Sequence, residues 1–186
     1  MTHPALYAEQ IAAQQLSNSE LIKLHQGEIL VNTRSHTVCG GALDSRMYLP
    51  LTRCQVWDQV TNYPRWSTYF PDITQSRVIE ENAHAPHLGH RIYQAAEKSF
   101  LFITAQVNVY LRVFELEQRH IRFQFERGSF LDFTADLTLS DLNGGTLLHY
   151  SVSATPLVPV PSFFVEQAMK LDLPNNLRSM RQKLCR

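Results

Sequence analysis

Residues 103–113 of the chain read ITAQVNVYLRV, and this stretch decides the fold class. Apolar side chains occupy every second position from Ile103 to Val113, and most positions between them are polar. A period of two is typical of a β-strand with one buried face, because successive side chains of a strand point to opposite sides. The stretch therefore predicts a strand in an antiparallel sheet that is apolar on one face and solvated on the other.

The same alternation extends through the neighbouring segments, with turn-forming residues between them. Gly128 and the run Asn143-Gly144-Gly145 lie at two of the breaks. In the segment that follows Gly128, the alternation places Leu131 and Phe133 together on the apolar face. We expect six consecutive strands near residues 73–81, 88–98, 101–114, 119–126, 130–141 and 146–155.

A hairpin is predicted before this meander. The hydrophobic period changes to two at the start of residues 28–50, and Gly40-Gly41 predicts a two-residue turn because glycine tolerates positive φ. Residues 1–26 instead have helical periodicity, which Gly27 ends. We expect residues 1–26 to form an N-terminal helical extension and residues 27–186 to form one domain.

Three helices complete the predicted architecture. A short helix over residues 52–61 and a helical turn over 65–70 follow the hairpin, and Thr52 is placed to cap the first. A long C-terminal helix is expected over about 162–184, with an interruption at Pro174, which lacks the N–H that an intact helix needs. Its apolar stripe consists of Val165, Met169, Leu173, Leu177, Met180 and Leu184.

The resulting α+β fold predicts an internal cavity. A helix of this length spans roughly 35 Å at ~1.5 Å per residue, about the width of seven strands spaced ~4.8 Å apart. However, one helix about 10 Å thick does not fill the concave side of a curved sheet of seven to eight strands. We therefore expect an apolar cavity between sheet and helix, where small molecules bind in many folds.

Charge and composition exclude several classes of protein. Lys+Arg and Asp+Glu each total 17, so the chain lacks the basic field of a nucleic-acid binder. No apolar run approaches the ~18 residues of a transmembrane helix, and the first residues show no secretory signal. Cys39, Cys54 and Cys185 form no C-x-x-C motif, which favours reduced thiols and a cytoplasmic protein.

The candidate binding residues are the aromatic and inward-facing side chains. Tyr63, Trp66 and Tyr69 crowd the short helices, where they either line the cavity mouth or fill the core. Gln94 and Tyr150 fall on inward faces, and a buried amide or phenol bonds either to the protein or to a ligand. The apolar lining is expected to consist of Ile92, Val107, Val109, Ile121, Phe123, Phe133, Ala135, Leu148, Val165 and Met169.

Other reactive residue types do not combine into a catalytic or metal site. His84-x-x-His87-x-x-His90 falls in a turn where side chains diverge, so no metal or cofactor is expected. Cys54 has no base near it in sequence and is interpreted as a small buried helix residue. Ser129 lacks the G-x-S-x-G context of a nucleophile and is interpreted as a turn residue.

Several segments resemble the START-like (SRPBCC) helix-grip superfamily, and more narrowly its polyketide cyclase/dehydrase and coenzyme-Q-binding branch, in a form common among cyanobacterial proteins. The resemblance covers about residues 27–184. Its motifs are Gly27-Glu28-Ile29-Leu30-Val31, Val56-Trp57-x-x-Val60-Thr61-x-Tyr63, Phe70-Pro71-Asp72-Ile73-x-x-Ser76, Gly128-Ser129-Phe130, Gly145-Thr146-x-Leu148-x-Tyr150 and Leu173-Pro174-x-Asn176-Leu177-x-x-x-Arg181.

The resemblance implies a helix-grip fold and non-catalytic binding or transport of a lipid, an isoprenoid quinone or a pigment-like molecule. An aromatase/cyclase acting on a polyketide-like substrate is the alternative, and a protein-interaction module is a third. The apolar loop over residues 156–164 either staples the helix to the sheet or docks on a membrane or a partner. No nucleic-acid partner is expected.

Overall fold

The structure is a computed structural model that describes residues 16–82, 86–100, 103–158 and 167–186. Within these ranges the chain forms an eight-stranded antiparallel sheet in the order β1-β2-β8-β7-β6-β5-β4-β3, in which β2 pairs with the last strand of the chain. The strands are β1 (Ile29–Thr37), β2 (Gly40–Leu49), β3 (Ile73–Glu80), β4 (His90–Phe100), β5 (Ile103–Leu116), β6 (His120–Gly128), β7 (Phe130–Leu142) and β8 (Gly145–Pro156).

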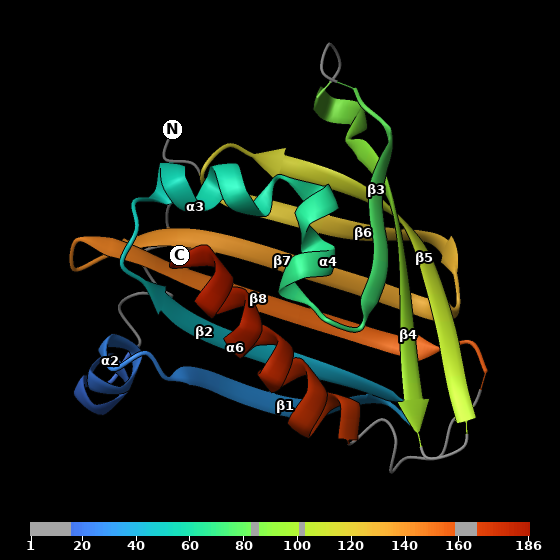
Figure 1. Cartoon of the computed structure of the whole chain (residues 1–186), viewed down its shortest axis with the longest axis horizontal. Coiled ribbons are helices and arrows are strands. Elements are labelled where there is room, and N and C mark those ends of the chain that lie inside the picture. Colours follow the sequence, from blue (N-terminus) through green and yellow to red (C-terminus); the bar gives the residue numbers. More distant parts are fainter. Residues whose placement is uncertain (1–15, 83–85, 101–102, 159–166) are drawn as a thin grey trace.

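Helices cover one face of this sheet, as Figure 1 shows. The long C-terminal helix α6 (Leu173–Leu184) crosses the strands, and α3 (Arg53–Val60), the 3₁₀ turn η1 (Tyr63–Arg65) and α4 (Trp66–Tyr69) lie beside it. The element order and the covering helix confirm the predicted α+β helix-grip fold. A further helix, α2 (Asn18–His25), lies beside β1 and β2 at one edge.

The hairpin β1–β2 forms as predicted, but its turn lies earlier in the chain. Thr37 pairs with Gly40, so Val38 and Cys39 make the turn and neither Gly40 nor Gly41 has a positive φ. A Cβ on Gly40 would lie 2.5 Å from Thr37 Oγ1 and 2.8 Å from the backbone oxygen of Ala154. The predicted turn at Gly40-Gly41 is wrong because Gly40 serves close packing rather than chain reversal.

The start of α3 follows from its capping sequence. Thr52 Oγ1 accepts a hydrogen bond from the Gln55 backbone N–H, and the Gln55 side chain accepts one from the Thr52 backbone N–H. The helix buries Val56, Trp57 and Val60. Cys54 lies on the other side and is exposed, so its interpretation as a buried residue is wrong.

The C-terminal helix is interrupted before Pro174, as predicted. The described part begins at residue 167, passes through a π-helical turn, η3 (Ala168–Asp172), and continues as α6, with Pro174 in the first turn of α6. A proline is tolerated there because the first N–H groups of a helix have no intrahelical partner. Leu177, Met180 and Leu184 are buried against the sheet, as the stripe predicts, while Val165 lies outside the described residues.

The other face of the sheet carries close contacts between histidine and aspartate side chains. His120 Nε2 and Arg122 Nε lie 2.6 and 2.9 Å from the same Asp136 oxygen. Burial alone would raise the pKa of Asp136, but the hydrogen bonds from His120 and Arg122 outweigh it and hold that pKa below its usual range. Comparable pairs join His149 to Asp44 and His36 to Asp132.

The lowered pKa of Asp136 predicts that Asp136→Asn changes the stability of the protein by an amount that depends on pH. A carboxylate with a lowered pKa in the folded protein stabilises it above its unfolded pKa of about 3.9 and loses that effect as the pH falls through the lower folded value. At pH 7 the variant should therefore unfold at lower urea concentration than wild type, and the difference should shrink as the pH falls below the unfolded pKa of about 3.9. Asp141→Asn is the control, because Asp141 is 72% exposed and its pair with Arg53 contributes little. An equal difference at pH 7 and below that pKa would contradict the prediction.

Candidate functional site

A cavity of about 380 Å³ lies between the sheet and the C-terminal helix. Side chains of β4, β5, β7 and β8 form its floor, Trp66 and Phe70 form one wall, and η3 and the start of α6 form another. Its size falls in the range of small-molecule sites, roughly 300–1,000 Å³, and most of the lining side chains are apolar. Curvature of the sheet thus leaves the kind of space that the sequence predicts.

The structure brings six of the predicted binding residues together around this cavity: Trp66, Gln94, Val107, Val109, Phe133 and Tyr150. Seven others lie in the packed core instead: Tyr63, Tyr69, Ile92, Ile121, Phe123, Ala135 and Leu148. Val165 and the side chain of Met169 lie outside the described part of the chain.

The division between core and cavity follows from the short helices. Trp66 packs against Phe123 with ring centroids 5.1 Å apart, and Tyr63 packs against the same ring at 6.1 Å. These aromatic contacts fill the end of the concave face that lies under α3 and α4. The cavity is therefore confined to the other end, beside Gly41, Ala154 and η3.

The predicted mouth of the cavity near Trp66 and Tyr69 is wrong. Both side chains are buried, at 3% and 0% exposure, and their polar atoms bind helix carbonyls. Trp66 Nε1 donates to the Val60 backbone oxygen at 2.8 Å, and the Tyr69 hydroxyl donates to that of Gln59 at 3.1 Å. Of the two alternatives for these aromatics, Tyr69 fills the core, whereas Trp66 fills the core and also lines the cavity.

Tyr150 contributes a phenol to the lining of the cavity. Its ring lies 6.5 Å from Trp66 and 6.4 Å from Phe70, and burial raises the pKa of its phenol well above the ordinary value. Among the residues that the structure describes, none hydrogen-bonds to its hydroxyl, although the side chain is only 6% exposed. A hydroxyl that lines an apolar cavity is stabilised when a ligand or a water molecule supplies a hydrogen-bond partner.

Gln94 is held by the protein. Its Nε2 donates to Ser76 Oγ at 3.2 Å, and Ser76 Oγ donates to the Tyr63 backbone oxygen at 2.7 Å. The carboxamide therefore has a fixed orientation on the cavity wall. Across the cavity, Asn176 Nδ2 lies 3.4 Å from Asp72 Oδ2, so a second polar contact joins α6 to the start of β3.

Phe130 is a cavity residue that the alternation pattern missed. A β-bulge between Phe130 and Asp132 shifts the register of β7 against β8, which turns Phe130 inward and leaves Leu131 61% exposed. The prediction that Leu131 shares the apolar face is wrong for this reason. In the sequence, Gly128 was the sign of an irregular backbone just before β7. Its φ of +145° is one that only glycine adopts readily.

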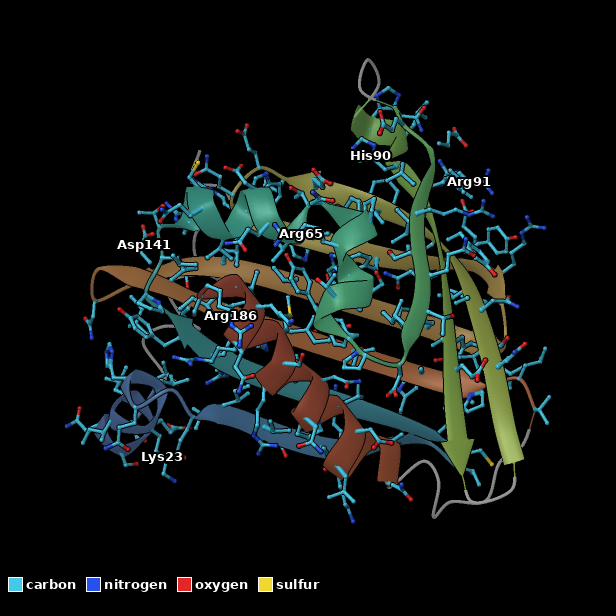
Figure 2. The ribbon with its side chains drawn as sticks, viewed as in Figure 1. Lys23, Arg65, His90, Arg91, Asp141 and Arg186 are labelled. Atoms are coloured by element: carbon cyan, nitrogen blue, oxygen red, sulfur yellow. The ribbon has the colours of Figure 1, made fainter. Side chains whose placement is uncertain are left out.

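Three ionisable side chains belong to the described lining of the cavity. The ionisable residues among its described lining are Asp72, Asp172 and Tyr150, without histidine or cysteine. The side chains labelled in Figure 2, on α2, η1, β4, β7 and at the C-terminus, do not belong to the lining of the cavity. Within the described ranges, no group of three histidine, cysteine or acidic residues could hold a metal ion.

Comparison with known proteins places this geometry in a family. The model of the family described as polyketide cyclase/dehydrase and lipid transport matches residues 49–181. The chain belongs to this family. A search of the curated proteins by sequence finds no match.

Solved structures of the family's fold resemble the chain closely in shape but not in sequence. A STAR-related lipid transfer protein from Xanthomonas axonopodis has a TM-score of 0.66 at 14% identity, over 85% of this chain and 94% of its own. A START superfamily protein from Mycobacterium smegmatis gives 0.60 at 14%, over 85% and 97%. The Zhui aromatase/cyclase from Streptomyces sp. R1128 gives 0.56 at 8%, over 82% and 94%.

These likenesses establish the START-like helix-grip fold. A lipid transfer protein and an aromatase/cyclase both have this architecture. None of the helices formed by the described residues is long and apolar enough to span a membrane.

Proposed function

We propose that the protein binds a hydrophobic small molecule in the cavity and carries or sequesters it without chemical change. The observation that supports this most directly is an apolar cavity that Tyr150 lines, with no hydrogen bond from the described residues to the Tyr150 hydroxyl. Apolar contact would contribute roughly 25 cal/mol per Å² of buried ligand surface before the costs of association. The phenol would fix one polar atom of the ligand, such as a carbonyl or hydroxyl oxygen.

The volume of the cavity bounds the ligand. At about 30 Å³ per water-sized group, a cavity of about 380 Å³ holds roughly a dozen such groups. A compact ring system fits completely, whereas a long isoprenoid or acyl chain would leave part of its length outside. A lipid, an isoprenoid quinone and a pigment-like molecule therefore all remain candidates, with the ring or head of a quinone inside the cavity.

The surface beside the cavity supports exchange of the ligand with a membrane. Pro156 and Phe130 line the cavity, and the neighbouring side chains Leu131, Leu157 and Val158 are 61%, 51% and 70% exposed. The Leu157 backbone N–H donates to the Ser129 carbonyl, which holds these two segments together. Exposed apolar side chains at one place mark a contact with lipid or protein, and we propose peripheral contact with a membrane during loading.

Native mass spectrometry of the protein purified from its own host tests the proposed function. Organic extraction of the same sample gives the mass of the bound molecule. We expect one apolar ligand per chain, recovered chemically unchanged after incubation with the protein. Conversion of that ligand during incubation would instead support the aromatase/cyclase alternative, and the absence of any ligand together with no uptake of hydrophobic probes would contradict the proposal.

Tyr150→Phe should separate stability from binding. Removing this hydroxyl, which no described residue binds, should raise the free energy of unfolding of the empty protein by about 1 kcal/mol. It should also lower the affinity for a ligand with a polar head about fivefold to tenfold. Tyr63→Phe is the matched control, because the Tyr63 hydroxyl donates to Glu115, and its loss should destabilise the protein. Urea unfolding and probe titration measure both effects. Equal destabilisation by the two variants would show that Tyr150 has a structural partner.

A further inference from the structure

A row of arginine and tyrosine side chains crosses the face of the sheet opposite the cavity. Arg77 on β3 pairs with Tyr93 on β4, Tyr93 with Tyr110 on β5, and Tyr110 with Arg127 on β6. These four residues, the Arg–Tyr row, are therefore direct neighbours across four adjacent strands. They face away from the cavity, because Ile92, Gln94 and Val109 of the same strands face the core or the cavity.

The row is ordered by its own contacts. The Arg77 guanidinium lies 5.0 Å from the centre of the Tyr93 ring, and that of Arg127 lies 4.1 Å from the centre of the Tyr110 ring. The two tyrosine rings lie 5.0 Å apart at an angle of 56°. Such cation–π contacts favour these positions of the two guanidinium groups, and both arginines are exposed to solvent.

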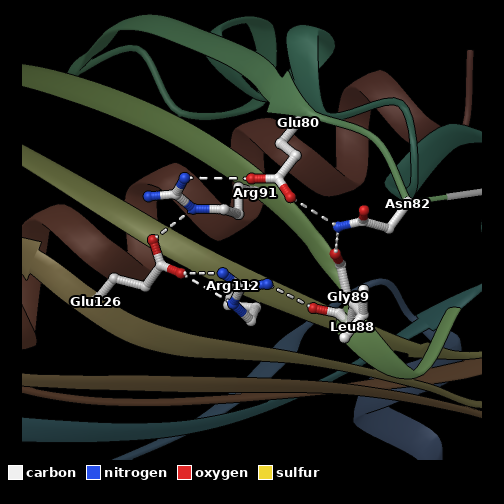
Figure 3. A network of polar contacts seen from close by, with 7 residues as sticks. All are labelled: Glu80, Asn82, Leu88, Gly89, Arg91, Arg112 and Glu126. Atoms are coloured by element: carbon white, nitrogen blue, oxygen red, sulfur yellow. Dashed lines mark hydrogen bonds and ion pairs between the residues drawn. The ribbon is translucent and has the colours of Figure 1, made fainter. Parts of the chain in front are cut away.

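The arginines of the row differ from their neighbours on the same face. Figure 3 shows Arg91 and Arg112 sharing the Glu126 carboxylate at 2.8 Å each, with Arg91 also reaching Glu80. Arg77 and Arg127 are exposed, and no carboxylate among the described residues pairs with either of them. The described part of the protein thus presents two guanidinium groups that contact tyrosine rings and form no ion pair with a described carboxylate.

We propose that the Arg–Tyr row is a docking site for an acidic segment of a partner protein. A guanidinium edge matches a carboxylate with two parallel hydrogen bonds, and arginine and tyrosine are the residue types that dominate binding energy at protein interfaces. The row lies on rigid strands, so little order is lost when a partner binds. Because the cavity lies on the opposite face, a partner docked here would leave it accessible.

The spacing of the row defines the partner segment. The backbones of Arg77 and Arg127 are separated by three strand-to-strand distances of about 4.8 Å, or about 14 Å in total, and the contacts along the row set a similar upper limit for the two guanidinium groups. An extended peptide rises about 3.3 Å per residue, so acidic residues four positions apart span the two guanidinium groups. Nucleic acid fits less well, since each tyrosine ring is already covered by a guanidinium and the chain has no net positive charge for phosphates to meet.

A peptide titration of the full chain tests the site. The probe is a capped ten-residue peptide with glutamate at its third and seventh positions, and the control peptide has glutamine there. In ¹⁵N NMR spectra we expect the glutamate peptide to shift amide signals of β3–β6 with a Kd below about 1 mM. The double substitution Arg77→Gln and Arg127→Gln should weaken binding at least tenfold, while Arg77→Lys with Arg127→Lys should give an intermediate loss, because lysine keeps the charge but not the planar edge.

Matched variants and competitors complete the test. Arg34→Gln with Lys183→Gln removes the same charge from exposed positions elsewhere and should leave peptide binding unchanged. Uptake of a hydrophobic probe by the cavity should be the same in every variant, so failure at the row and failure of the cavity are distinguishable. Equal binding of both peptides, shifts confined to other elements, or tighter binding of a ten-nucleotide thymidine strand to the same face would each overturn the proposal.

Discussion

Val107→Phe should reduce the uptake of hydrophobic ligands by at least tenfold while the protein stays folded. Val107 lines the cavity from β5 and is only partly buried, so a larger side chain at this position has free space to enter. The added ring occupies volume that a ligand would fill and removes the apolar contacts that give it affinity. Displacement of a fluorescent hydrophobic probe measures the effect.

Thr134→Phe is the matched control for this experiment. Thr134 is exposed on β7 and lies next to Phe133 and Ala135, which point to the other side of the sheet. The same aromatic side chain at this position adds apolar surface without entering the cavity, so uptake should equal that of wild type. If Val107→Phe binds every probe as tightly as Thr134→Phe does, the cavity is not the binding site.

The strands of this protein could be predicted from the sequence because one face of the sheet is buried and the other is solvated. Side chains assigned to the inward face, such as Ile92, Ile121 and Phe123, are 0–2% exposed. The alternation of apolar and polar residues shows which side chains point inward. A shift of the strand register by one residue would place the apolar side chains in solvent. The covering helix was equally predictable, because its stripe has a period that only a helix presents on one side.

The boundary of the cavity could not be predicted in the same way. Whether an inward side chain contacts a ligand or another side chain depends on which helix lies above it. Trp66 reaches Phe123, and this contact assigns Phe123 to the core. Such contacts join residues far apart in the sequence, and no local pattern records them.

Local irregularities of the backbone explain the remaining differences. The bulge at Phe130 reversed the inward and outward positions at the start of β7, and Gly40 was mistaken for a turn residue. In both cases a glycine lies close to the position that was predicted wrongly. The sequence shows that a glycine is present but not why the structure requires it. Glycine accommodates a special φ or a close neighbouring atom, and only the coordinates distinguish these.

Gly128→Ala should be among the most destabilising substitutions in the protein. Gly128 has a φ of +145°, and a Cβ there would lie 2.3 Å from the backbone oxygen of Asn108 and 2.9 Å from the Cα of Val109. Both obstacles are backbone atoms of the paired strand, so they move only if β5 and β6 separate. Backbone strain and overpacking together should cost about 3–5 kcal/mol, which lowers Tm by roughly 10 °C for a chain of this size.

Gly144→Ala separates the two contributions. Gly144 also has a positive φ, of +82°, but no atom lies within 4 Å of the position that a Cβ would take. Its substitution should cost only the backbone term, about 1–2 kcal/mol. Because Asn108 and Ser129 line the cavity and the Ser129 backbone N–H donates to the Asn108 carbonyl, Gly128→Ala should also weaken ligand binding, whereas Gly144→Ala should not. Thermal unfolding measures the Tm of both variants. Equal losses of Tm would show that the clash of the added Cβ with β5 does not contribute to the destabilisation by Gly128→Ala.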